Sequence, residues 1–146
     1  MLIDLRDIRQ DTDYDCGAAA VRAIASHYGC AARPAGLANP VQGMAPDTLA
    51  AALRAMGLRV ASLQMLGGVA DLRHYTRLGF PVACPITSEA GGHWVVVRGV
   101  ERGRVHVQCP TRGPGSYPVA QWLAGWHDVS AETLQLFDRW GIVAAK

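Results

Sequence analysis

The sequence predicts one α+β domain, and three observations support that prediction. The chain has 146 residues, which is close to one domain at ~100–200 residues per domain. Apolar residues recur at helical spacing in the first half, whereas β-prone runs dominate after residue 80. Helices followed by an antiparallel sheet are typical of the α+β class. We therefore expect a single domain over 1–146, with a helical part over about 10–79, a sheet part over about 80–128 and a C-terminal helix over about 130–141.

Three helices are expected in the helical part. The first begins near Asp15 and Cys16, where Asp13 or Asp15 offers an N-cap oxygen, and its apolar stripe continues to Tyr28. Gly29 then stands where a helix C-cap belongs. The second helix is expected over 46–56 and the third over 69–78, with a loop over 33–44 and a short strand over 58–65 between them.

The sheet part contains a clear β-hairpin. Residues 93–100 are rich in β-prone side chains, a tight turn over 101–104 follows, and residues 105–109 alternate with period two. An extended apolar run over 81–86 precedes this hairpin. After it we expect a Pro/Gly-rich loop over 110–118, a helical turn over 119–124, and a helix over 130–140 that docks through Leu134, Phe137 and Trp140.

Composition and charge exclude several classes of protein. Half of the residues are apolar and 18% are charged, as in ordinary globular proteins. Lys and Arg number 14 against 12 Asp and Glu, a net charge of +2, so we expect no nucleic-acid partner. No run of ~18 apolar residues occurs and the first residues lack the apolar stretch of a secretory signal. We therefore expect a cytoplasmic protein without membrane insertion.

The four cysteines are Cys16, Cys30, Cys84 and Cys109. Two disulfides are one alternative, but small disulfide scaffolds are denser in cysteine and carry export signals. No C-x-x-C pair occurs, which argues against a structural zinc site. We therefore expect free thiols in a reducing compartment, no metal and no cofactor.

Cys16 is the candidate nucleophile. A cysteine in the first turn of a helix lies among unpaired N–H groups at the positive end of the helix dipole, which favours the thiolate. Gly17 leaves room for a substrate, and Gln10 can bring an amide donor beside the thiol. His93 is the best partner, because it begins a strand after a Gly-Gly pair that lets the backbone approach a bound peptide. The alternative from spacing alone is a buried helical cysteine and a histidine with a structural role.

Four segments, in order along the chain, resemble a known family. The family is that of the bacteriocin-processing, double-glycine leader peptidases, which are papain-like cysteine peptidases often found as N-terminal domains of peptide-exporting ABC transporters. The Gln-to-Cys separation, the Asp-Cys-Gly triplet and the small residues after it match the family's signature. The similarity extends over roughly residues 5–128, in the segments 10–20, 43–49, 80–85 and 92–97.

The resemblance implies a papain-like fold, in which an N-terminal helical subdomain packs on a C-terminal antiparallel sheet. It implies that Cys16 is the nucleophile, Gln10 the oxyanion-hole amide and His93 the general base and acid. The implied reaction is cleavage of a leader or precursor peptide after a pair of small residues, and a transporter acting in trans is a further expected partner. Contacts with the substrate are expected from Tyr14, Gly17, Gly92 and Trp94.

One position departs from the family's pattern. The family ends the hairpin after its histidine with Asp-Pro, whose Asp orients the imidazole, whereas this chain has Cys109 and Pro110. A neutral thiol is a weaker acceptor than a carboxylate and should hold the imidazole less firmly. Asp128 and Gln108 are alternative acceptors, although strand alternation puts Gln108 on the face opposite Cys109. A redox-sensitive pair of Cys109 with Cys16 is another alternative.

Three functions therefore remain open at this point. The first is an active cysteine endopeptidase that uses Cys16 and His93. The second is a catalytically weak or inactive module that binds a leader or partner peptide. The third is a papain-like amide or isopeptide transferase, because transfer uses the same cysteine and histidine.

Overall fold

A computed structural model describes residues 2–10, 16–30, 44–88, 91–130 and 133–146. The elements, in chain order, are α1 (Cys16–His27), α2 (Pro46–Ala55), β1 (Arg59–Gln64), α3 (Val69–Arg77), β2 (Val82–Ser88), β3 (Gly91–Glu101), β4 (Arg104–Cys109), β5 (Gly113–Pro118), α4 (Val119–Gly125), β6 (His127–Val129), β7 (Leu136–Asp138) and β8 (Trp140–Ala145). The predicted helices over 16–28, 46–56 and 69–78, the short strand over 58–65 and the 93–109 hairpin are all confirmed.

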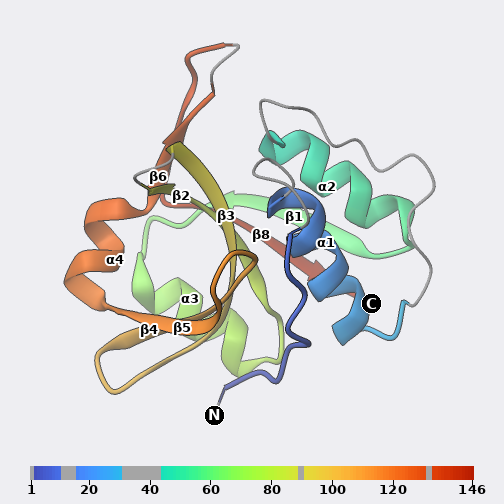
Figure 1. Cartoon of the computed structure of the whole chain (residues 1–146), viewed down its shortest axis with the longest axis horizontal. Coiled ribbons are helices and arrows are strands. Elements are labelled where there is room, and N and C mark those ends of the chain that lie inside the picture. Colours follow the sequence, from blue (N-terminus) through green and yellow to red (C-terminus); the bar gives the residue numbers. More distant parts are fainter. Residues whose placement is uncertain (1, 11–15, 31–43, 89–90, 131–132) are drawn as a thin grey trace.

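A six-stranded antiparallel sheet in the order β1-β8-β2-β3-β4-β5 forms the centre of the protein. Helices α1 and α2 cover one face and α3 and α4 cover the other (Figure 1). Successive side chains of β3 alternate between the two layers: Trp94 and Val96 join the core under α1, whereas Val95 and Val97 join the core under α3. Strand β3 is therefore buried on both faces along this stretch.

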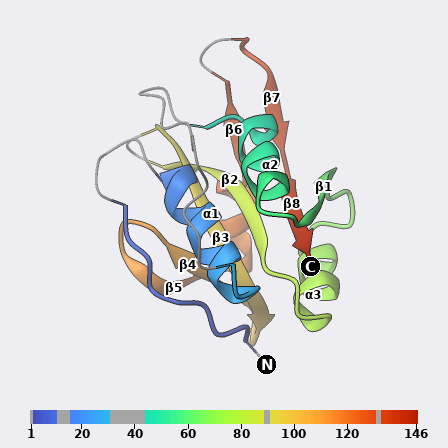
Figure 2. The same cartoon turned by 90° about the vertical axis from the view of Figure 1, so that its right-hand side faces the viewer.

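The small two-stranded sheet of β6 and β7 projects from the body of the protein (Figure 2). Its strand β6 lies beside the end of the β2–β3 hairpin, where Thr87 donates a hydrogen bond to the His127 carbonyl over 2.8 Å. The Asp128 carboxylate occupies the space that a side chain at position 92 would need, so Gly92 cannot carry a Cβ without displacing it.

The predicted C-terminal helix over 130–141 is wrong in the described part of that segment, which forms β7 and β8. Strand β8 pairs with both β1 and β2, and Ile142 and Val143 are buried on opposite faces of the sheet. The helical spacing of Leu134, Phe137 and Trp140 suggested a helix, but Leu134 is 78% exposed and has a positive φ of 58°. Long-range strand pairing outweighs local helical periodicity here.

The expectation of a Pro/Gly-rich loop over 110–118 is also wrong for most of that segment, because it contains the strand β5. This strand pairs with β4 along its full length and forms the edge of the sheet. Proline is tolerated there because an edge strand need not donate every backbone N–H to a neighbour. The sheet accordingly extends beyond the expected 80–128, since β1 and β8 also belong to it.

A buried hydrogen bond links β3 to the segment before α2. The Trp94 indole, 3% exposed, donates to the Met44 carbonyl over 2.8 Å. Trp94→Phe should lower the free energy of unfolding by about 1–3 kcal/mol, because the carbonyl loses its buried donor. Urea unfolding measures this effect.

Trp122→Phe is the matched control for the Trp94 experiment. Within the described part of the chain, the buried indole nitrogen of Trp122 has no hydrogen-bond partner, so its variant loses a similar volume without losing a hydrogen bond. Equal destabilisation by the two variants would show that the Trp94 hydrogen bond contributes nothing.

Candidate active site

Cys16 is the first residue of α1 and is 6% exposed. The alanine-rich face of α1 lets the helix lie close to the sheet, in the same core as Trp94 and Val96 of β3. The first N–H groups of a helix have no partner within the helix, so the thiol is next to a set of backbone donors. The fold thus places a cysteine with donor groups beside the strand that carries His93.

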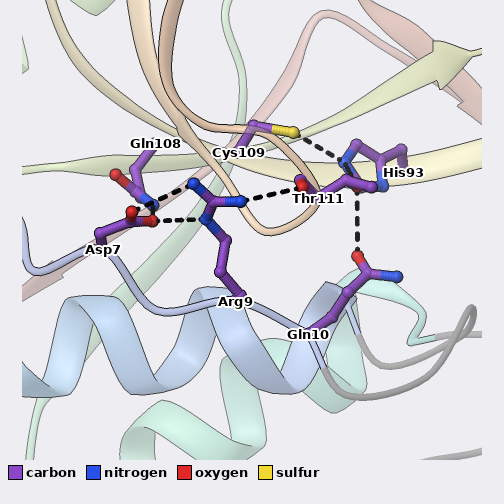
Figure 3. A network of polar contacts seen from close by, with 7 residues as sticks. All are labelled: Asp7, Arg9, Gln10, His93, Gln108, Cys109 and Thr111. Carbon is purple, nitrogen blue, oxygen red and sulfur yellow. Dashed lines mark hydrogen bonds and ion pairs between the residues drawn. The ribbon is translucent and has the colours of Figure 1, made fainter.

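His93 lies near the start of β3, opposite Ile86 of β2. Its Nε2 is 3.3 Å from the Sγ of Cys109 and 3.4 Å from the Oγ1 of Thr111. Cys109 reaches this position because Val96 pairs with Gln108, which brings the last residue of β4 beside β3. The imidazole is half-buried, with its Nε2 directed toward the β4–β5 turn (Figure 3).

His93 and Cys109 each stabilise the charged form of the other. Burial disfavours the charged imidazolium, but hydrogen bonds with Cys109 and Cys16 outweigh it and raise the pKa of His93 to about 9. Burial likewise disfavours a thiolate at Cys109, but the hydrogen bonds from His93 and from the Arg112 and Thr111 backbones lower its pKa to about 7. Between these values, the imidazolium and the Cys109 thiolate form an ion pair.

Gln10 lies beside the same turn. Its backbone N–H donates to the Pro110 carbonyl over 2.9 Å, and its Oε1 accepts from the Thr111 hydroxyl over 3.4 Å. The predicted approach of Gln10 to the site is therefore seen, although its role in holding an oxyanion stays a prediction.

The other predicted site residues have different surroundings. Gly17 is buried, and a Cβ there would come within 2.7 Å of the Met44 Cβ, so the glycine makes room for core packing. Trp94 is likewise buried, and Gly92 is exposed. Tyr14 lies outside the described residues, as do Asp13 and Asp15, the expected helix caps. Contacts between these residues and a substrate stay predictions.

Among the described residues, neither of the two alternative acceptors is hydrogen-bonded to His93. The Gln108 amide nitrogen donates to the Asp7 carboxylate over 2.7 Å, on the side expected from strand alternation, and within the described residues its buried Oε1 has no hydrogen-bond partner. Asp128 accepts from the Val129 N–H over 2.8 Å and packs against Gly92; burial raises the pKa of its carboxyl. Cys109 and Thr111 are thus the acceptors that the structure places at the His93 Nε2.

Sequence reasoning missed Thr111 and the pair formed by Asp7 and Arg9. The Arg9 guanidinium donates to Asp7 over 2.7 and 3.2 Å and to the Thr111 carbonyl over 3.2 Å. These residues are exposed or half-exposed and belong to no local pattern, so nothing in the sequence alone marked them. Only the pairing of the N-terminal segment with the β4–β5 turn brings them to the site.

All four cysteines are free thiols. Among the described residues, no group of three or more His, Cys, Asp or Glu side chains is arranged to hold a metal ion. None of the described helices is long and apolar enough to cross a membrane.

The helix that begins with Cys16, packed on the antiparallel sheet that carries His93, is the arrangement of the papain-like α+β fold. The model of the Peptidase C39 family matches residues 5–134. The chain therefore belongs to the Peptidase C39 family.

Solved structures share this fold. A double glycine motif protease from an AMS/PCAT transporter, in complex with the leader peptide, has a TM-score of 0.76 at 15% identity, covering 98% of this chain and 92% of that one. The peptidase domain of Streptococcus ComA, a bi-functional ABC transporter, has a TM-score of 0.74 at 21% identity, covering 98% of each chain. A C39-like peptidase from Bacillus anthracis has a TM-score of 0.74 at 13% identity, covering 99% of this chain and 97% of that one. Among curated proteins, no sequence matches this chain.

Proposed function

We propose that the protein is a cysteine endopeptidase that cleaves a leader or precursor peptide after a pair of small residues. The observation that supports this most directly is that the half-buried His93 interacts with two thiols: hydrogen bonds with Cys109, 3.3 Å from its Nε2, and with Cys16 raise the pKa of His93. An imidazole charged at neutral pH beside the nucleophilic cysteine, here Cys16, is the pair that such a peptidase needs. The similarity to a double glycine motif protease with bound leader peptide supports the substrate class.

In the proposed reaction, the Cys16 thiolate attacks the scissile carbonyl carbon and the carbonyl oxygen becomes an oxyanion. The Cys16 N–H and the Gln10 amide donate hydrogen bonds to that oxyanion. The His93 imidazolium then protonates the leaving amine as the C–N bond breaks, which produces an acyl-enzyme. Water next gives a proton to the neutral imidazole and attacks the thioester, which releases the acid and restores the ion pair.

We further propose small residues before the cut because a double glycine motif protease is among the solved structures that share this fold. Free thiols persist in reducing compartments, which favours the cytoplasm as the place of the reaction. The similarity to the peptidase domain of a bi-functional ABC transporter supports a transporter as a partner of this chain.

Synthetic peptides test the proposed function. A leader-like peptide with Gly-Gly should be cut after the pair by the full chain, whereas the same peptide with Val-Leu at that place should stay intact. Intact mass measurement identifies the products, and pretreatment of the enzyme with iodoacetamide should stop cleavage. Equal cleavage of both peptides would overturn the specificity.

A second candidate is a peptide-binding module that does not cut. Cys109 favours it, because a thiol stands where the family has its orienting carboxylate. In the peptide experiment this function would appear as saturable binding of the Gly-Gly peptide without any product.

A further inference from the structure

Thr111 occupies a position between two groups of the candidate site. Its Oγ1 is 3.4 Å from the Oε1 of Gln10 and 3.4 Å from the Nε2 of His93. A hydroxyl has one proton to donate and two lone pairs to accept with. The Gln10 Oε1 can only accept, so the Thr111 proton points to it, and a lone pair of Thr111 remains for the N–H of His93.

This arrangement sets the orientation of both neighbours. Because the Gln10 side-chain oxygen faces Thr111, the side-chain nitrogen of Gln10 points away from Thr111 (Figure 3). Because Thr111 and Cys109 both accept at Nε2, that nitrogen carries a proton, and the proton exchanged with Cys16 and the leaving group moves through Nδ1. One hydroxyl thus contacts both the proposed oxyanion donor, Gln10, and the imidazole of His93.

Thr111 is an exposed turn residue, but the N-terminal segment holds it in place. Arg9 donates to its carbonyl over 3.2 Å, and Asp7 fixes Arg9 while also accepting from Gln108. Gly113, with a φ of +82°, leaves the space for the guanidinium, since a Cβ there would collide with the Arg9 side chain. Hydrogen bonds thereby join the N-terminal segment to the β4–β5 turn, which lies about a hundred positions further along the chain.

We propose that Thr111 is a positioning residue that turns the Gln10 amide toward the developing oxyanion and holds His93 with its proton on Nε2. This inference rests on the proposed peptidase function. Thr111 itself touches no reacting atom and acts through its two neighbours.

The test compares Thr111→Val, which removes the hydroxyl at nearly constant shape, with Thr111→Ser, which retains it. For Thr111→Val, kcat on the Gly-Gly peptide should fall about tenfold, a part of the ~10²–10³ that loss of a whole oxyanion donor costs. KM should change less than about twofold, because the hydroxyl contributes to the transition state and not to peptide binding. Thr111→Ser should restore most of kcat, and a peptide aldehyde, which forms an oxyanion on the enzyme, should bind more weakly to Thr111→Val alone.

Thr133→Val is the control, because Thr133 is also exposed and belongs to no part of the site. It should leave both kcat and KM unchanged. An active wild type with an equally active Thr111→Val variant would overturn the role of Thr111 and leave the peptidase function intact. A wild type as inactive as Cys16→Ala would overturn the peptidase function and this inference with it.

Discussion

Replacing His93 by Ala should slow peptide cleavage by about 10²–10⁴-fold, the usual contribution of a general acid–base group. The same variant should also slow alkylation of Cys16 below pH 8. The reason for both effects is the raised pKa of His93, about 9, which keeps the imidazole charged at neutral pH. Without that positive charge, a thiolate at Cys16 loses its cationic partner, and the imidazolium that protonates the leaving amine is missing.

Alkylation by iodoacetamide, followed by peptide mapping across pH 5–10, measures the reactivity of each cysteine. Cys16→Ala should abolish cleavage, and its remaining labelling identifies the contribution of the other thiols. Cys84 is an internal control, because it is fully buried and desolvation raises its pKa far above the usual range. Unchanged Cys16 reactivity in His93→Ala would show that the two side chains do not form a working pair.

Replacing Cys109 by Asp should widen the pH range of activity on the acid side. In the wild type, the pKa of Cys109 is about 7, so its thiolate becomes a neutral thiol as the pH falls through that value. A neutral thiol accepts weakly, and the imidazolium is then held less firmly. An Asp carboxylate, with an ordinary pKa of ~3.9, stays charged down to much lower pH. We expect kcat/KM at pH 6 to rise about tenfold in Cys109→Asp.

The basic side should change little in that variant. Activity is lost there as the imidazolium deprotonates, and the pKa of His93 is near 9 in the wild type. Two other titratable groups interact with Cys109: Arg9 interacts electrostatically with it, and burial and the Cys109 thiolate raise the pKa of Tyr117, which therefore stays neutral. Neither changes its charge near pH 7, so a difference between the acid limbs of the wild type and Cys109→Asp reports the charge of residue 109.

Two further variants distinguish the effect of the charge at residue 109 from the effect of removing a thiol. Cys109→Ala should be less active than the wild type at every pH, since the His93 Nε2 loses its thiolate acceptor and keeps the weak contact with Thr111. Cys30→Ala removes another free thiol and should leave the pH profile unchanged. Identical acid limbs in the wild type and Cys109→Asp would show that Cys109 does not act as an anion.

Much of the fold could be predicted because its signals are local. The first helix, with Cys16 at its start, follows from an apolar stripe and a C-terminal glycine. A short turn between β-prone runs predicted the β3–β4 hairpin, which carries both His93 and Cys109. Short segments of the sequence were therefore enough to predict Cys16 and His93 as site residues. They also showed that Cys109 stands where the family has a carboxylate.

The errors arose where distant segments decide the local structure. Residues 140–145 form a strand because β1 and β2 offer their backbone groups on both sides, which no helical periodicity of the segment reveals. Residues 113–118 form a strand because β4 has a free edge beside them, in spite of their prolines.

What the sequence by itself determined is the α+β class and the elements with strong periodicity, and it also predicted that Cys16, His93 and Gln10 belong to one candidate site. What only the tertiary structure decided is how that site is held: Cys109 and Thr111 at the His93 Nε2, and the Asp7–Arg9 pair on the turn (Figure 3). The physical reason is the separation along the sequence of the residues that interact. Helix and hairpin signals act between residues a few positions apart, whereas the hydrogen bond between Thr111 and Gln10 joins positions separated by 101 residues and exists only once the N-terminal segment has packed beside the end of β4.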